Sequence, residues 1–179
     1  MCRELENRVI SDRETPVFLA LGSNKGDRLE FLRNALKGLE RGGFRILKVS
    51  SVYETEPVGC YDDSAPYFNA VLEGRWQGDA ESLLHLCQSL EQAAGRPLDH
   101  APMVARELDL DLLLFGDQII QTAHLTIPHP RAAERSFVMV PLYEIAPDLV
   151  FPDCGLRVTE IYRSLLPHDG ISAALCRIF

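Results

Sequence analysis

Residues 106–115 read Arg-Glu-Leu-Asp-Leu-Asp-Leu-Leu-Leu-Phe, and this alternating stretch predicts a β-strand. Side chains on a strand alternate between its two faces, so the even-numbered leucines would share one face, and Asp109 and Asp111 the other. Leu113 and Phe115 would continue the face of the aspartates. The Cα atoms of the two aspartates would lie about 7 Å apart, which is two rises of roughly 3.3 Å. Two carboxylates this close repel each other unless a cation lies between them.

The aspartate pair has two interpretations. A half-exposed strand with a solvated acidic face is the ordinary one for an Asp-x-Asp pattern. Here the apolar Leu113 and Phe115 follow on the same predicted face, so the acids would border buried structure. Hard cations such as Mg²⁺ suit paired carboxylates, particularly when phosphate oxygens complete the coordination shell. The second interpretation, a magnesium and phosphate site, is therefore favoured.

The composition is that of an ordinary globular protein, with 179 residues of which 46% are hydrophobic. We expect a loose N-terminal extension over 1–15 and a single domain over 16–179. The net charge of -8 argues against a general nucleic-acid or membrane-surface binder, because both need a basic surface. The five scattered cysteines contain no Cys-x-x-Cys pair, which predicts reduced thiols in a cytoplasmic protein rather than a zinc site.

Short apolar strands interleaved with two clear helices predict an α+β sandwich with a largely antiparallel sheet. Asp27 and Asp79 are suitable N-caps for the two helices, and Gly42 and Gly43 would end the first. We expect strands at 16–21, 44–55, 67–76 and within 106–115, helices at 28–41 and 80–94, a strand at 118–121 that pairs back on the aspartate strand, and helical pieces at 131–135, 138–146 and 158–165.

Four arginines flank the aspartate strand along the chain. Arg96 and Arg106 lie at the two ends of an irregular loop before it, and Arg131 and Arg135 follow the turn Pro128-His129-Pro130. Guanidinium groups pair with two phosphate oxygens at once. Any one of these residues read alone is an ordinary surface arginine, but their grouping in an acidic chain indicates a polyphosphate site.

Three further features are compatible with ligand binding. The turn at 21–27, which includes Asn24, leads from a strand into a helix N-terminus and resembles a phosphate cradle. A plain strand–helix turn is the more common interpretation, and the P-loop pattern is absent. Tyr67 and Asn69 share a strand face and could stack on and hydrogen-bond a flat heterocycle, or Tyr67 could belong to the core. His129 could donate to a phosphate, act as a general acid, or be a simple turn histidine.

In combination, these segments resemble the hydroxymethyl-dihydropterin pyrophosphokinases of folate biosynthesis. Their order and spacing match from about residue 17 to 152. The resemblance implies a ferredoxin-like three-layer sandwich with a mainly antiparallel central sheet and helices on both faces. The matching segments are Leu-Gly-Ser-Asn at 21–24, Val-Tyr-Glu-Thr-Glu-Pro-Val-Gly at 52–59, Tyr-Phe-Asn-Ala at 67–70, Arg-Glu-Leu-Asp-Leu-Asp at 106–111, Ile-Pro-His-Pro at 127–130 and Arg-Ser-Phe at 135–137.

The resemblance also implies an activity. An ATP-dependent diphosphotransferase would move pyrophosphate from ATP to the hydroxymethyl group of 6-hydroxymethyl-7,8-dihydropterin and leave AMP. Asp109 and Asp111 would hold two Mg²⁺ ions, and Arg96 and Arg106 would join them as catalytic residues. The residues implied around ATP are Gln88, Glu91, Arg96, Arg106, Leu112, Thr126, His129 and Arg135.

A slot for the pterin is implied next to these residues, with Tyr67 and Phe137 on the two sides of its ring. The loops at 56–66 and 96–105 would close over both substrates and exclude water. The partners would be these two small molecules, with no nucleic acid and no membrane, and the chain would be a monomer. The residues implied for the slot are Asn24, Thr55, Pro57, Val58, Tyr67, Asn69 and Phe137.

The chain departs from the family pattern in the second loop. Met103-Val104-Ala105 replaces the usual aromatic, glycine and proline, and Leu98-Asp99-His100 lacks a basic residue, so the lid is less basic. Two other functions stay open. Another Mg-dependent phosphoryl or nucleotidyl transferase would need no slot at Tyr67 and Asn69. A non-catalytic ferredoxin-like ligand-binding module would need neither metal nor ATP.

Overall fold

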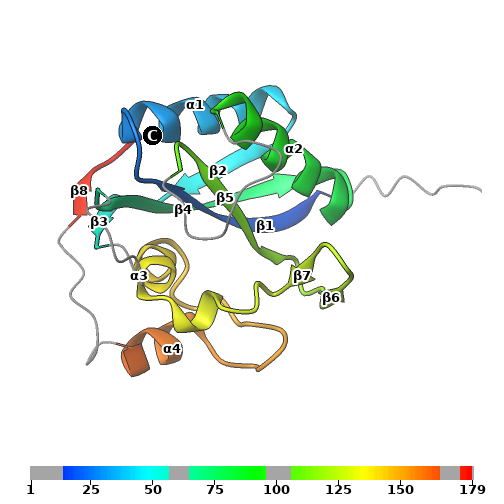
Figure 1. The fold of residues 1–179 in the computed structure, drawn as a ribbon. Coiled ribbons are helices and arrows are strands. Elements are labelled where there is room, and N and C mark those ends of the chain that lie inside the picture. The colour runs from blue at the N-terminus through cyan, green and yellow to red at the C-terminus, as the bar shows by residue number, and fades with distance from the viewer. Residues whose placement is uncertain (1–13, 57–64, 96–105, 166–173, 179) are drawn as a thin grey trace, which may run out of the picture.

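Antiparallel strands form the middle layer of the protein (Figure 1). The computed structural model describes residues 14–56, 65–95, 106–165 and 174–178. Every strand pair of the six-stranded sheet in these ranges is antiparallel. The strand order is β5-β1-β4-β3-β8, and β2 also pairs with β4. The strands are β1 (Thr15–Ser23), β2 (Arg45–Val49), β3 (Val52–Thr55), β4 (Tyr67–Trp76), β5 (Asp109–Phe115) and β8 (Ala174–Cys176).

Helices cover both faces of this sheet (Figure 1). Alternate residues of the central strands pack on opposite sides, so that Leu19 and Leu72 meet the first pair of helices, and Phe18 and Val71 meet the second group. The three-layer α+β sandwich predicted from the sequence is therefore confirmed. One face carries α1 (Arg28–Arg41) and α2 (Ala80–Ala93), and the other carries the 3-10 helix η1 (Ala132–Glu134), α3 (Ser136–Ile145) and α4 (Val158–Leu165).

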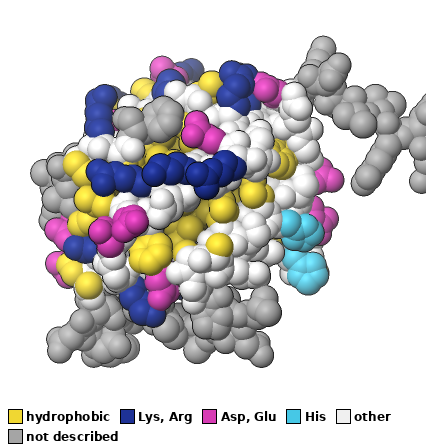
Figure 2. All heavy atoms as spheres, turned by 90° about the horizontal axis from the view of Figure 1, so that it is seen from above, with side chains coloured by type: hydrophobic (Ala, Val, Ile, Leu, Met, Phe, Trp, Pro, Cys, Tyr) yellow, Lys and Arg dark blue, Asp and Glu magenta, His cyan; other side chains and the backbone are white. Residues whose placement is uncertain are grey.

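Local capping signals define the two long helices as the sequence predicts. The Asp27 side chain accepts a hydrogen bond from the backbone N of Glu30 at 3.0 Å, and Asp79 accepts one from the backbone N of Ser82 at 2.8 Å. At the other end of α1, Gly43 has a φ of 94° and turns the chain toward β2. Figure 2 shows basic side chains in a row on the outer surface of this layer.

Residues 44–55, predicted as one strand, form two, and that prediction was wrong in this respect. Side-chain hydrogen bonds interrupt the ladder at Ser50 and Ser51. The Ser50 Oγ accepts from the backbone N of Val71 at 2.9 Å, and both the backbone N and the Oγ of Ser51 donate to the Glu144 carboxylate of α3. The Ser50 N still donates to the Val71 carbonyl at 2.9 Å, but the ladder is broken at Ser51, and β2 and β3 pair separately with β4.

The segment after β5 also differs from the prediction, because it does not pair back on β5. Its strand β6 (Ile120–Gln121) pairs with β7 (Thr126–Ile127) in a small separate sheet. Thr122 closes the turn between them, since its N donates to the Leu125 carbonyl at 2.9 Å and its Oγ1 accepts from the Leu125 N at 3.0 Å.

A β-bulge interrupts the alternation of β5. The register with β1 shifts between Phe18 and Leu19, which lie opposite Leu114 and Leu112. Leu113 therefore stays on the face of the aspartates, as predicted, and packs below α3, but Leu114 packs there too. Phe115 packs in the cluster on the other face. The predicted faces of Leu114 and Phe115 were wrong, because one extra residue in a strand moves all later side chains to the opposite face.

The predicted N-terminal extension lies almost entirely outside the described residues. Within it, Thr15 already belongs to β1, and Glu14 forms an ion pair with Arg45 of β2. In the part of the chain that the structure describes, no helix combines the length and the apolar character needed to cross a membrane.

Candidate active site

A row of residues crosses three adjacent strands on the face of the sheet that α3 covers. Gly22 of β1 lies in register with Asn69 of β4 on one side and with Asp109 of β5 on the other. A Cβ atom on Gly22 would lie 3.3 Å from Asn69 Oδ1, 3.8 Å from Asp109 Cβ and 4.0 Å from Tyr67 Cδ1. The missing side chain therefore keeps a space between three residues predicted for the site. Gly22 itself had no predicted role, although a glycine inside a strand is a signal of close approach.

The two aspartates lie on this face, as the strand pattern predicts. Asp111 is two residues further along β5, where it lies in register with Ala20 of β1. The side chains of Asp109 and Asp111 are 26% and 35% exposed, so both remain accessible to a small ligand. Two accessible carboxylates fit a magnesium ion that takes its remaining ligands from phosphate and water. In the described ranges no group of three or more His, Cys, Asp or Glu side chains forms an all-protein metal cage.

Basic groups from separate elements surround the acid pair. Arg106, just before β5, donates from Nη1 to Asp109 Oδ1 at 2.8 Å. Arg135, just before α3, places Nη1 at 3.5 Å from Asp111 Oδ2, and the Nε2 of His129 lies 3.9 Å from the same oxygen. The structure therefore brings together three residues that were predicted around ATP.

The charge balance at Asp111 favours a cation. Burial is the main cause that raises the pKa of its carboxyl above the usual 3.8, and the neighbouring charge of Asp109 raises it further. His129, Arg135 and Arg106 act in the opposite direction but do not cancel these effects. A divalent ion beside the pair would stabilise its ionised form.

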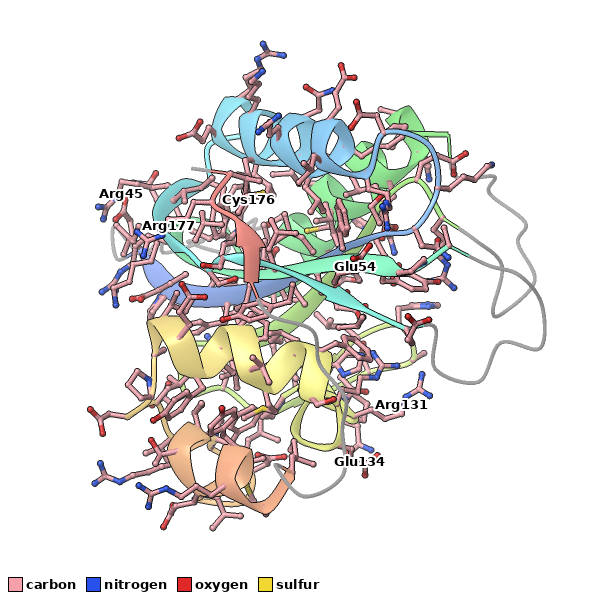
Figure 3. The ribbon with its side chains drawn as sticks, turned by 90° about the vertical axis from the view of Figure 1, so that its left-hand side faces the viewer. Arg45, Glu54, Arg131, Glu134, Cys176 and Arg177 are labelled. Atoms are coloured by element: carbon pink, nitrogen blue, oxygen red, sulfur yellow. The ribbon has the colours of Figure 1, made fainter. Side chains whose placement is uncertain are left out.

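The tautomer of His129 follows from its contacts. Its Nδ1 accepts a hydrogen bond from the backbone N of Arg131 at 3.2 Å, so in the neutral ring the proton is on Nε2, the atom nearer Asp111. Burial lowers the pKa of the imidazole below 6.5, and the positive charges of Arg135 and Arg131 add to this effect although Asp111 opposes them. Figure 3 shows Arg131 on the same side of the sheet as α3. His129 is therefore a neutral hydrogen-bond donor near pH 7.

Arg106 is held in place by the turn at the end of β1. The backbone N of Asn24 donates to the Arg106 carbonyl at 3.0 Å, and Asn24 Oδ1 accepts from the Arg106 N at 2.7 Å. An ion pair between Lys25 and Glu107 reinforces the contact. Among the described residues, Asn24 Nδ2 and Ser23 Oγ are buried without a hydrogen-bond partner. Asn24 thus positions Arg106 and still offers an amide donor.

The described residues predicted for the pterin lie mainly around the end of β3 and the start of β4. Asn69 Nδ2 donates to Thr55 Oγ1 at 2.7 Å, and both side chains are buried. Tyr67 is the registered partner of Thr55 and is partly exposed, as is Phe137 at the start of α3. Pro57 and Val58, also predicted for this slot, lie outside the described residues.

The predicted ATP residues Gln88 and Glu91 belong to α2, which packs next to the edge strand β5. Glu91 is buried, and its Oε1 accepts from the backbone N of Leu110 at 2.8 Å. The N of Leu112 points the same way, because backbone groups two residues apart on a strand share a direction. Gln88 and Thr126 are exposed. Arg96 and the substituted residues 98–100 and 103–105 are outside the described ranges.

Comparison with known proteins identifies related sequences along most of the chain. Residues 18–147 match the family described as 7,8-dihydro-6-hydroxymethylpterin-pyrophosphokinase (HPPK). The chain is 43% identical over 129 residues to the 2-amino-4-hydroxy-6-hydroxymethyldihydropteridine pyrophosphokinase of Bacillus subtilis, with 72% of this chain and 76% of that protein covered. The protein of the same name from Haemophilus influenzae is 38% identical, over 86% of this chain and 95% of its own length.

Longer proteins contain a similar region. The folic acid synthesis protein fol1 of Pneumocystis carinii is 37% identical over 155 residues, which are 86% of this chain but only 20% of fol1. The fold of a Plasmodium falciparum HPPK-DHPS crystal structure is similar, with a TM-score of 0.71 and 14% identity over 90% of this chain and 48% of the other. The chain therefore spans about a fifth to a half of these longer relatives.

Proposed function

This chain belongs to the 7,8-dihydro-6-hydroxymethylpterin-pyrophosphokinase family, and we propose that it transfers pyrophosphate from ATP to the hydroxymethyl group of 6-hydroxymethyl-7,8-dihydropterin. The observation that carries the proposal is the registered row Asn69–Gly22–Asp109. In this row the Asn69 amide and the Asp109 carboxylate lie on one face of the sheet, and the glycine between them has no side chain to fill the space. This arrangement supports a heterocycle slot beside a metal ligand.

The proposed reaction is an in-line displacement. The substrate hydroxyl attacks the β-phosphorus of ATP, the bond from that phosphorus to the oxygen bridging to the α-phosphate breaks, and AMP leaves with that oxygen. The hydroxyl proton passes to solvent. Two Mg²⁺ ions held by Asp109 and Asp111 would offset the negative charge of the triphosphate. The protein contributes positioning rather than a covalent intermediate.

The basic residues of the site suit the phosphates. Arg106 and Arg135 present guanidinium groups beside the metal ligands, and each can pair with two phosphate oxygens. His129 offers a neutral Nε2–H donor on the same side. Arg96 would complete the set by analogy with the family. The three arginines and the His129 donor are suited to stabilise charge that develops on the transferred group and on AMP.

The nucleoside part of ATP would lie along the outer edge of β5. The backbone of Leu112 and Thr126 would recognise the base, because β5 is the last strand at this side of the described sheet and β7 lies beside it. Glu91 would shape this end of the site through its bond to Leu110. The exposed amide of Gln88 is available on the same side.

The pterin would enter the slot at the end of β3 and the start of β4. Thr55 and Asn69 would hydrogen-bond its polar edge, and Tyr67 and Phe137 would contact the two faces of its ring. Asn24 Nδ2 would provide one more donor. Pro57 and Val58 would complete the wall. We further propose a cytoplasmic monomer with one catalytic domain over 16–179 and no nucleic-acid or membrane partner.

An assay for AMP tests the proposal. The purified chain with ATP, Mg²⁺ and the reduced pterin should release one AMP for each pterin consumed, and Asp111→Ala should abolish the reaction while the fold is retained. Release of ADP or pyrophosphate instead would indicate another phosphoryl or nucleotidyl transferase. No response to Mg-ATP in a calorimetric titration would favour a non-catalytic module.

A further inference from the structure

Arg28, the first residue of α1, joins two strands that lie on either side of a loop. Its Nη1 donates to Glu54 Oε1 at 3.2 Å and to the Pro66 carbonyl at 2.6 Å. Its guanidinium carbon lies 3.6 Å from the centre of the Phe68 ring. Glu54 belongs to β3, whereas Pro66 directly precedes β4. One side chain thus makes three contacts at the point where β3 ends and β4 begins.

These contacts lie on the opposite face of the sheet from the residues of the proposed pterin slot. Glu54 pairs with Phe68, and the next and last registered pair of the two strands is Thr55 with Tyr67. Because neighbouring side chains on a strand point to opposite faces, Arg28 contacts the α1 face while Thr55 and Tyr67 point to the α3 face. In Figure 3, Glu54 lies on the sheet well away from Arg45 of β2.

The strand that carries Glu54 and Thr55 is short, and so is its other neighbour. β3 contains only four residues, and its other neighbour β8 contains three. Strand ends open readily when few bonds close them. A guanidinium that binds both strands and stacks on a ring can keep Thr55 and Tyr67 in register, which a lysine ammonium cannot do with the same geometry. Its exposed fraction of 24% shows that this contact is partly shielded from water.

We propose that Arg28 is a positioning residue for the pterin slot, which pre-organises Thr55, Tyr67 and Asn69 for a flat heterocycle without contacting it. The inference rests on the proposed function. Pre-organisation removes part of the ordering that ligand binding would otherwise require, so its loss weakens affinity for the heterocycle. The ATP side is held by other contacts, at Arg106 and Asp111, and should not respond.

Steady-state kinetics with both substrates test this inference. Arg28→Ala should raise the KM for the pterin about tenfold, since a hydrogen bond to a charged group typically contributes a factor of this order. The KM for ATP and the kcat at saturation should stay near those of the unmodified chain. Arg28→Lys should give an intermediate pterin KM. Arg45→Ala is the matched control, because its ion pair with Glu14 lies away from the slot.

A direct binding measurement separates positioning from general destabilisation. Pterin affinity, followed by its fluorescence with a non-hydrolysable ATP analogue present, should fall in Arg28→Ala but not in Arg45→Ala. Glu54→Gln should give the same selective loss if Arg28→Ala fails to fold. An unchanged pterin affinity in a folded variant, or an equal loss for both substrates, would overturn the inference. Absence of AMP formation by the unmodified chain would instead contradict the proposed function.

Discussion

Arg135, directly before α3, places its Nη1 3.5 Å from the Oδ2 of Asp111 in β5. A second arginine, Arg106, binds the other acid in the same way, at 2.8 Å from Asp109 Oδ1. Each proposed metal ligand thus has a cation from the proposed phosphate-binding set beside it. A metal at the carboxylates and phosphates at the guanidinium groups would replace these ion pairs together. Binding of Mg²⁺ and of ATP should therefore be strongly coupled.

Thermal unfolding should reveal this coupling. Mg²⁺ alone should raise the melting temperature little, because two carboxylates supply only part of its coordination shell and phosphate oxygens are needed to complete it. ATP with Mg²⁺ should raise it clearly, since a ligand at about 100 times its Kd stabilises the folded state by about 2.7 kcal/mol. Scanning calorimetry with Mg²⁺, with ATP plus EDTA, and with both measures the three cases. An equal shift for Mg²⁺ alone would contradict the exchange of partners.

The charge of Asp111 should cost stability when no metal is bound. Its pKa is raised in the folded protein, so the fold disfavours the ionised form. Asp111 therefore lowers the free energy of unfolding once it ionises, and this loss develops as the pH rises above 3.8 through the raised pKa. Asp111→Asn should therefore melt a few degrees higher than the unmodified chain at pH 7.5 in EDTA, and the difference should shrink toward pH 4.

The same variant should lose activity. Asparagine keeps the shape of the side chain but removes the charge that holds a cation, so Mg-dependent AMP release should disappear although the protein is more stable. Asp148→Asn is a suitable control, because this exposed carboxylate pairs only loosely with Arg157, at 3.5 Å. If Asp111→Asn were less stable than the unmodified chain, the ionised Asp111 would not be destabilised by its burial and by the charge of Asp109, and the interpretation would be wrong.

Asn24 should be needed to place Arg106. In Asn24→Ala the partly buried Arg106 N loses its acceptor at 2.7 Å, and loss of a hydrogen bond of this kind costs about 1 kcal/mol of stability. We expect a lower kcat as well, because Arg106 would lose its fixed direction. Asn24→Asp keeps the acceptor and should recover much of the stability. Asn34→Ala, on the exposed side of α1, is the control; equal effects at both positions would exclude a special role.

Local sequence signals predicted the parts of the fold that depend on neighbours in the chain. The caps at Asp27 and Asp79 and the bounds of β4 (67–76) were confirmed, because the interactions behind them span only a few residues. The family was confirmed too, since its motifs lie within the matched residues 18–147. The positions of the aspartates follow from strand alternation alone.

Long-range contacts explain what the sequence did not reveal. At the break, Ser51 bonds to Glu144, which lies 93 residues further along the chain. The bulge in β5 lies opposite Phe18 of β1, which packs below α3. No local pattern carries either effect. The same holds for the site, because only the register of β1 with both neighbours brings Asn69 close to Asp109. The roles of these residues in binding stay predictions.

Gly22 should be essential for the space between the slot and the acids. A methyl group there would lie 3.3 Å from Asn69 Oδ1, so Gly22→Ala should displace that amide and raise the KM for the pterin about tenfold, by loss of one hydrogen bond. Gly155→Ala separates this effect from stability. That glycine has a φ of 70° with no atom within 4 Å of an added Cβ, so its replacement should lower the melting temperature without changing the pterin KM. If Gly22→Ala keeps the KM of the unmodified chain, the row Asn69–Gly22–Asp109 does not border the substrate.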